Sequence, residues 1–240
     1  MQNKYPQKPG IDFILKQAFF YWNKTLIFQL VFSIIYFAVF FTSIFFFASK
    51  YGIWEQNQAL MEAFQESTQA YLQKAAELGT TENSRYFSYA FLGTIVFLYP
   101  LNLGFFKIFK KIDLNEKIEL GDLFAGYSGI NFFKYIGYFL FWILIYLMIA
   151  QTIILPFLWV MITLFVAPLM FFTDKRIFEA MSLNFKALRM FFLEVSVCMI
   201  VALLFKYVGF MLFFVGGLFT FPFWNAMIYS LYKTIFTEKN

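Results

Sequence analysis

The chain has 240 residues, of which 61% are hydrophobic and 14% are charged, and its formal net charge is +5. A soluble domain is roughly 45–50% apolar and about 25% charged, because polar side chains must cover its surface. This composition predicts an integral membrane protein and excludes disordered, collagen-like and disulfide-stabilised chains.

The residue counts also limit the chemistry. The sequence has no histidine, which excludes Ser-His-Asp and Cys-His catalysis, HExxH zinc sites and His-ligated iron. The single cysteine, Cys198, lies in an apolar run and is expected to be a small core residue. We therefore predict no enzymatic activity, no catalytic residue, no metal and no cofactor. The basic residues flank apolar runs, so we expect no nucleic-acid partner.

The first predicted elements are an interfacial helix and a membrane span. Residues 11–24 are amphipathic, with Asp12 as the expected helix cap, and they either lie at the membrane interface or form the entry turn of the next span. Residues 25–48 carry no charge and exceed the roughly 20 residues that a spanning helix needs. This run is too long for the apolar region of a signal peptide, so we expect none.

Residues 50–85 form the longest polar stretch and are acidic on balance. Apolar residues recur at three- and four-residue steps between about 55 and 78, which predicts a helix that ends near Gly79. Asn83 or Ser84 is expected to cap the helix that follows. The stretch either protrudes as a helical arm or lies on the membrane surface, and we predict that it contacts a membrane-protein partner.

Residues 86–106 form the second predicted span, with a kink at Pro100. A polar loop follows over residues 112–131, in which Asp122 is expected to cap a short turn. Residues 135–173 are uncharged and too long for one span, which predicts two spans, 132–151 and 155–172, with a turn near 151–154.

Residues 173–189 have the pattern of a basic amphipathic helix on the membrane surface, capped by Thr173 or Asp174. The fifth and sixth predicted spans are 190–207 and 209–231. We place their turn at 206–209 rather than at 216–217, because this leaves Lys206 at an interface. The predicted fold is therefore all-α: one polytopic transmembrane bundle, residues 1–240, with six spans and amphipathic interfacial helices.

Six spans put both termini on one side of the membrane. Of the 19 lysines and arginines, we expect only Lys50, Lys74, Arg85 and Lys206 on the opposite side. Because basic residues concentrate on the cytoplasmic side, this predicts cytoplasmic termini, an extracytoplasmic arm at 50–85, and location in the cytoplasmic (inner) membrane.

Three short segments are similar to a known family. They are Pro100 to Lys107 with Asp122 to Phe124, Ala167 to Ser182, and Pro222 to Tyr232. Together they resemble small six-helix bacterial membrane domains of unknown function, related to membrane domains fused to some glycerophosphodiester phosphodiesterases. The resemblance covers roughly residues 10–235. It implies a six-helix inner-membrane bundle with amphipathic cytoplasmic helices, but it does not carry over phosphodiesterase chemistry.

Ionisable and polar residues inside spans are the candidate functional residues. Glu194 and Lys206 are the ionisable candidates; interfacial placement is their alternative, and Glu194 could instead meet Lys107 or Lys134. Asn102 and Gln151 are polar candidates, for which hydrogen bonds between helices are the alternative.

The predicted function is that of a non-enzymatic scaffold, accessory or lipid-associated envelope component whose partners include membrane lipids. A transporter or channel for a small or lipid-like solute is the alternative.

Overall fold

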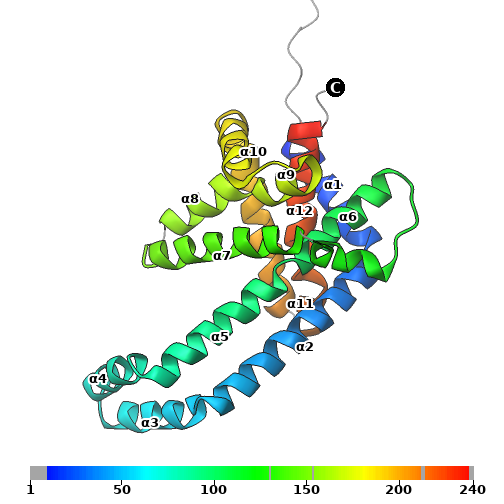
Figure 1. The fold of residues 1–240 in the computed structure, drawn as a ribbon. Coiled ribbons are helices and arrows are strands. Elements are labelled where there is room, and N and C mark those ends of the chain that lie inside the picture. Colours follow the sequence, from blue (N-terminus) through cyan, green and yellow to red (C-terminus); the bar gives the residue numbers. More distant parts are fainter. Residues whose placement is uncertain (1–9, 130, 153, 212–213, 238–240) are drawn as a thin grey trace, which may run out of the picture. The chain divides into compact units, whose positions relative to one another are not determined.

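The computed structural model describes residues 10–129, 131–152, 154–211 and 214–237, and helices are the only regular elements in these ranges (Figure 1). The all-α class is therefore confirmed. Five helical stretches in these ranges are long and apolar enough to cross a membrane, which indicates a membrane protein. They are Leu26–Lys50, Glu82–Asp113, Phe132–Ile149, Ile154–Thr173 and Ile177–Met211, and they fall over the first five predicted spans.

The predicted sixth span, residues 209–231, is not confirmed. This segment contains the end of α10 (Ile177–Met211), then α11 (Phe214–Thr220) and α12 (Phe223–Tyr232). At a rise of about 1.5 Å per residue, neither short helix alone matches the roughly 30 Å of a hydrocarbon core.

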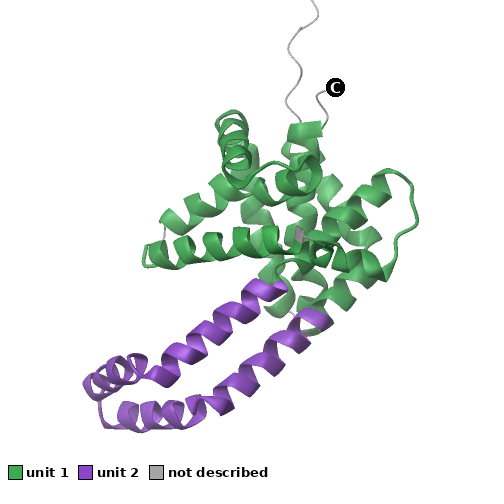
Figure 2. Cartoon of the chain, viewed as in Figure 1, with its two compact units in different colours: residues 1–34, 99–240 green, residues 35–98 purple. Residues whose placement is uncertain are grey.

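The chain divides into two compact units (Figure 2). Residues 35–98 form one, which we call the hairpin unit, and residues 1–34 with 99–240 form the other, which we call the bundle unit. Helix α2 (Leu26–Lys50) begins in the bundle unit and ends in the hairpin unit.

The hairpin unit contains the outer half of α2 and three further helices: α3 (Ile53–Glu66), α4 (Thr68–Gly79) and α5 (Glu82–Leu98). The helix predicted near 55–78 is broken at Ser67, whose hydroxyl accepts a hydrogen bond from the Ala70 N–H at 3.0 Å and so caps α4. Thr81, rather than Asn83 or Ser84, caps α5 by accepting from the Ser84 N–H at 3.3 Å.

Helix α12 lies at the centre of the bundle unit. Every residue in it except Trp224 is buried, and it packs against α1 (Ile11–Lys24), α6 (Leu101–Asp113), α9 (Val166–Thr173) and α10. A helix that is apolar on all sides and surrounded by other helices forms a core.

Two of the candidate membrane spans are interrupted. The second is interrupted at Tyr99–Pro100, between α5 and α6, at the proline where a kink was predicted. The fourth is divided into α8 (Ile154–Thr163) and α9. Asn184, which is fully buried, closes this second break: its Oδ1 accepts from the Phe165 N–H at 2.7 Å and its Nδ2 donates to the Met161 carbonyl at 3.0 Å.

Several helix ends differ from the sequence predictions. Gly10, not Asp12, is the N-cap of α1. Asp174 has a left-handed conformation (φ 51°) and ends α9, and α10 begins only at Ile177. Helix α7 (Asn131–Ile149) ends at the turn predicted near 151–154.

Helix α10 contains both the predicted amphipathic helix and the fifth predicted span. The two halves meet at a kink at Phe191, where φ is −124° and ψ is 31°. The turn predicted at 206–209 is wrong, because α10 continues as a helix to Met211. Gly209 is instead a packing residue: a Cβ there would lie 2.0 Å from the Thr220 Oγ1 and 2.8 Å from the Gly216 carbonyl oxygen.

Candidate functional site

A cluster of polar side chains surrounds Asp113, the last residue of α6. Tyr21 donates a hydrogen bond to Asp113 Oδ1 at 2.5 Å, and Tyr229 donates to Oδ2 at 2.7 Å. The Lys233 ammonium lies 2.7 Å from Oδ1 and donates to the Tyr21 hydroxyl at 3.0 Å. We call Tyr21, Asp113, Tyr229 and Lys233 the Asp113 cluster.

Three separate parts of the sequence build the Asp113 cluster. Tyr21 comes from α1, and Tyr229 and Lys233 lie one turn apart on α12 and the π-helical turn η2 (Lys233–Thr237). The rings of Tyr21 and Tyr229 meet edge to face with their centres 5.1 Å apart, and each lies 5.3 Å from the Phe109 ring. Both tyrosines are buried. Because both carboxylate oxygens are engaged, the cluster fastens α1, α6 and α12 to one another.

A second carboxylate, Asp122, lies between two lysines of α6. Lys107 and Lys111 each place their ammonium 2.8 Å from a different Asp122 oxygen, and the Glu119 N–H also donates to Asp122 at 2.9 Å. Burial raises the pKa of Asp122, but these hydrogen bonds together hold the pKa below its ordinary value. Asp122 was predicted to cap a turn. It is the third residue of the 3₁₀ helix η1 (Leu120–Tyr127), and it caps this helix by accepting from the N–H of Glu119, the residue that precedes the helix.

Close backbone packing brings Asp122 to α6. A Cβ on Gly104 would lie 2.2 Å from the Leu123 carbonyl oxygen, and a Cβ on Gly126 would lie 2.2 Å from the Pro100 carbonyl oxygen. Only glycine allows such an approach. The Pro100 to Lys107 and Asp122 to Phe124 segments, which carry the family resemblance, therefore form one packing unit in this chain.

A third ion pair joins Lys134 of α7 to Asp174, with 2.5 Å between the ammonium and the carboxylate. The hydrogen bond from Lys134 lowers the pKa of Asp174. The three aspartates therefore share one pattern, in which each is paired with lysine from another element. Such pairs orient helices, whereas acid–base catalysis requires a titratable group aimed at a substrate.

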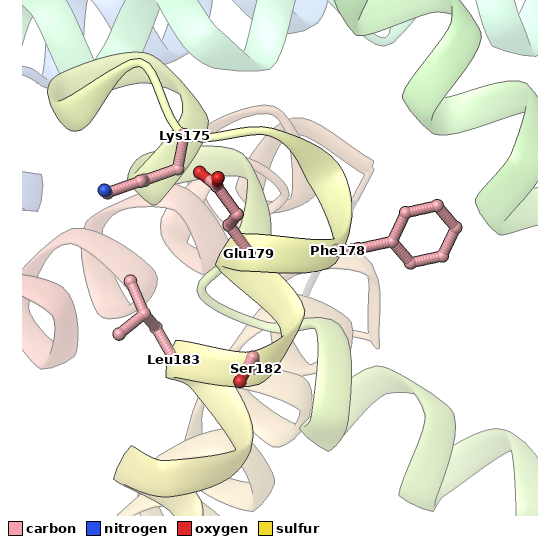
Figure 3. Close-up of a pocket in the computed structure, with 5 residues that line it drawn as sticks. All are labelled: Lys175, Phe178, Glu179, Ser182 and Leu183. Carbon is pink, nitrogen blue, oxygen red and sulfur yellow. The ribbon is translucent and has the colours of Figure 1, made fainter.

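An open depression of about 460 Å³ lies at the start of α10 in the bundle unit. Lys175, Phe178, Glu179, Ser182 and Leu183 line it (Figure 3). The Lys175, Glu179 and Leu183 side chains extend to one side of the helix, and Phe178 points to the other (Figure 3). None of the three paired aspartates lines it.

The four residues singled out from the sequence do not form a common site. Asn102 accepts a hydrogen bond from Asn225 Nδ2 at 3.1 Å, which joins α6 to α12 as expected for a packing role. Gln151 is exposed in the turn after α7. Lys206 lies within α10 with its ammonium 4.6 Å from the centre of the Phe221 ring.

Glu194 is half-buried three residues beyond the kink in α10 and forms no ion pair with a described residue. The pairing considered with Lys107 or Lys134 is not present, because these lysines pair with Asp122 and Asp174. Glu194 therefore remains a candidate by position alone.

The sequence analysis did not identify the Asp113 cluster or Asn184. Asp113 follows Lys110 and Lys111 and lies in the stretch predicted as a polar loop, and Lys233 lies beyond the last predicted span. The sequence does show a single acidic residue, Asp113, at the end of a largely apolar run. A carboxylate there needs a cationic partner if the helix end is buried. Nothing local indicates that the cation lies 120 residues away.

Comparison of the chain with protein-family models, with curated proteins and with solved structures found no match. The resemblance to the six-helix membrane domains therefore stays a prediction.

Proposed function

We propose that the chain is a non-enzymatic integral membrane protein that acts as a scaffold or accessory subunit and binds a membrane-protein partner through its 50–85 arm. The observation that carries the proposal is the surface of that arm. Neither α3 nor α4 has a buried residue. Met61, Phe64 and Leu72 are 57%, 57% and 62% exposed. Exposed apolar side chains on adjoining helices are typical of an interaction surface.

The organisation of the bundle unit supports this proposal. Its aspartates fasten helices together, and its central helix α12 is occupied by packing residues. Such a unit is suited to a structural role. We further propose the six-span topology, with both termini in the cytoplasm and the arm outside, in a bacterial inner membrane. The distribution of lysine and arginine supports this orientation.

The test is affinity purification of the full chain from native membranes into nanodiscs, followed by mass spectrometry of bound proteins and lipids. We compare the wild type with the triple variant Met61→Ser, Phe64→Ser, Leu72→Ser. The matched control is Leu147→Ser, Met148→Ser, which removes exposed apolar side chains from the end of α7. A stoichiometric protein lost only from the triple variant is expected. A protein profile unchanged by the triple variant contradicts the proposed role of the arm.

Transport of a small or lipid-like solute is the second candidate. The interrupted helices α8/α9 and α11/α12 favour it, because transporters bind substrates at broken helices. However, side chains of the protein already form hydrogen bonds with backbone groups at both breaks. Asn184 accepts from the Phe165 N–H at the first break, and Ser33 donates to the Leu218 carbonyl at 2.6 Å near the second. A solute strongly enriched over bulk membrane, with no protein partner, would favour transport.

Glu194→Gln separates the two candidates further. A scaffold is expected to keep its cellular role when this carboxylate is neutralised. Loss of complementation in a deletion strain, with normal protein levels, would favour a role for Glu194 in transport.

A further inference from the structure

The first half of α10, from Ile177 to the kink at Phe191, has a face that the chain itself does not cover. Phe178, Phe185 and Phe192 are 75%, 46% and 53% exposed. Phe178 and Phe185 are seven residues apart, which is close to two helical turns, so they form one row, and Phe192 follows directly after the kink. The opposite side of the same segment is buried in the bundle unit and consists of Ala180, Asn184, Ala187 and Leu188.

Unpaired cations accompany this aromatic row. Lys175, Arg176, Lys186 and Arg189 are exposed, and none forms an ion pair with a carboxylate in the described part of the chain. Glu179 is the one acidic residue between Lys175 and Met190.

Four other lysines of the bundle unit are paired. Lys107, Lys111, Lys134 and Lys233 each pair with an aspartate at 2.5–2.8 Å. Lys24, Lys110 and Lys206 form no ion pair with a described carboxylate either, but they lie apart from one another in the sequence. The start of α10 gathers four such cations around one acidic residue, and an anionic partner complements this excess of positive charge.

The aromatic row also continues into an apolar surface. Beyond the kink, α10 is a candidate membrane span, and Leu193, Ile200 and Leu204 on it are 64%, 46% and 61% exposed. On the segment before the kink, the Arg189 guanidinium lies 4.5 Å from the centre of the Phe185 ring. This places a cation directly beside the aromatic row.

We infer that the face formed by Arg176, Lys186, Arg189 and the Phe178–Phe185 row binds anionic phospholipid of the bilayer that the chain spans. The cations bind headgroup phosphates, and the phenylalanines enter the acyl boundary. Basic amphipathic helices bind anionic lipid surfaces through this combination of charge and apolar area. The inference rests on the proposed membrane placement, but not on a partner for the arm.

The test measures lipid selectivity in phosphatidylcholine vesicles that contain the purified full chain. Spin-labelled phosphatidylglycerol and spin-labelled phosphatidylcholine are added separately, and the motionally restricted fraction of each is measured by electron paramagnetic resonance. The wild type is expected to prefer phosphatidylglycerol. In the variant Lys186→Gln, Arg189→Gln, this preference is expected to fall about fivefold.

The matched control is Lys16→Gln, Lys117→Gln, which removes the same charge from two exposed lysines that already face carboxylates, Asp12 at 2.8 Å and Glu119 at 3.9 Å. The control is expected to keep the wild-type preference. Equal loss in both variants, or no preference in the wild type, overturns the inference and leaves the proposed function intact. If alkaline carbonate extracts the wild-type chain from the vesicles, the membrane placement is wrong and the inference falls with it.

Discussion

The bundle unit and the arm of the hairpin unit use polar and apolar residues in opposite ways. In the bundle unit, Asp113 and Asp122 are engaged by lysines and helix packing surrounds them. In the arm, α3 and α4 bury no residue, and Phe64 is more than half exposed. The difference teaches that charged residues can fasten the helices of one unit to each other, while apolar residues of another unit stay exposed and available for binding.

The largest expected effect on stability is at Asn184, and it tests whether buried polar residues hold the bundle unit together. Asn184→Ala leaves the Phe165 N–H and the Met161 carbonyl without their partner in a buried site. We expect a loss of about 2–4 kcal/mol in the free energy of unfolding, because two buried polar groups become unsatisfied. Unfolding of the detergent-solubilised protein by dodecyl sulfate, followed by circular dichroism, measures this. The exposed Ser182→Ala is the control; equal losses in the two variants would contradict the bridging role.

The Asp113 cluster provides the next test of whether polar contacts stabilise the bundle unit. Asp113→Ala is expected to lower the free energy of unfolding by about 1.5–3 kcal/mol, since three donors lose a charged acceptor. A double-mutant cycle with Lys233→Met gives the coupling between the two side chains. The two effects are expected to be clearly less than additive. Additive effects would show that the 2.7 Å pair does not stabilise the unit.

The stability that Asp122 contributes to the bundle unit is expected to depend on pH. Because its pKa in the folded chain lies below the ordinary value of 3.8, the stability it contributes is present above that value and is lost as the pH falls through the folded pKa. Asp122→Asn is expected to cost about 1–2 kcal/mol at neutral pH. Unfolding measured from pH 6 to pH 3 is expected to show the gap between wild type and variant narrowing at the acid end. A constant gap would indicate that Asp122 acts through packing rather than charge.

The smallest expected effect on stability lies in the arm. Phe64→Ser is expected to change the free energy of unfolding by less than about 0.5 kcal/mol, because the side chain is already exposed. Its effect is expected instead on recovery of the arm's protein partner, with Met148→Ser as the control. A large loss of stability would mean that Phe64 is packed in the protein, which would contradict the contrast between an exposed arm and a packed bundle unit.

The sequence predicted features that depend on neighbouring residues. The apolar periodicity of residues 173–189 and the uncharged run of residues 25–48 both correspond to helices, because each signal lies within one element. Pro100 was recognised as a break because proline lacks the N–H that a helix requires.

The sequence could not predict features that depend on distant partners. The break at Leu164–Phe165 lies one turn before Pro168, which has no N–H for the Leu164 carbonyl. The residue that satisfies the freed backbone groups, Asn184, lies 19 positions beyond Phe165, and no local pattern indicates it. Gly209 was interpreted as a turn residue, but its small size allows α11 to approach α10. The Asp113 cluster joins residues 92, 116 and 120 positions away from the aspartate, a separation that no local pattern reveals.

The central position of α12 has a consequence for biosynthesis. The hydrogen bond between Tyr21 and Lys233 cannot form until Lys233 has been synthesised, 212 residues after Tyr21. At the usual translation rate of 5–20 residues per second this takes roughly 10–40 s. During that interval α1 cannot pack against α12. An amphipathic helix can wait at the bilayer surface without exposing its apolar side to water, so the bundle is expected to close around α12 as a late, single step of assembly.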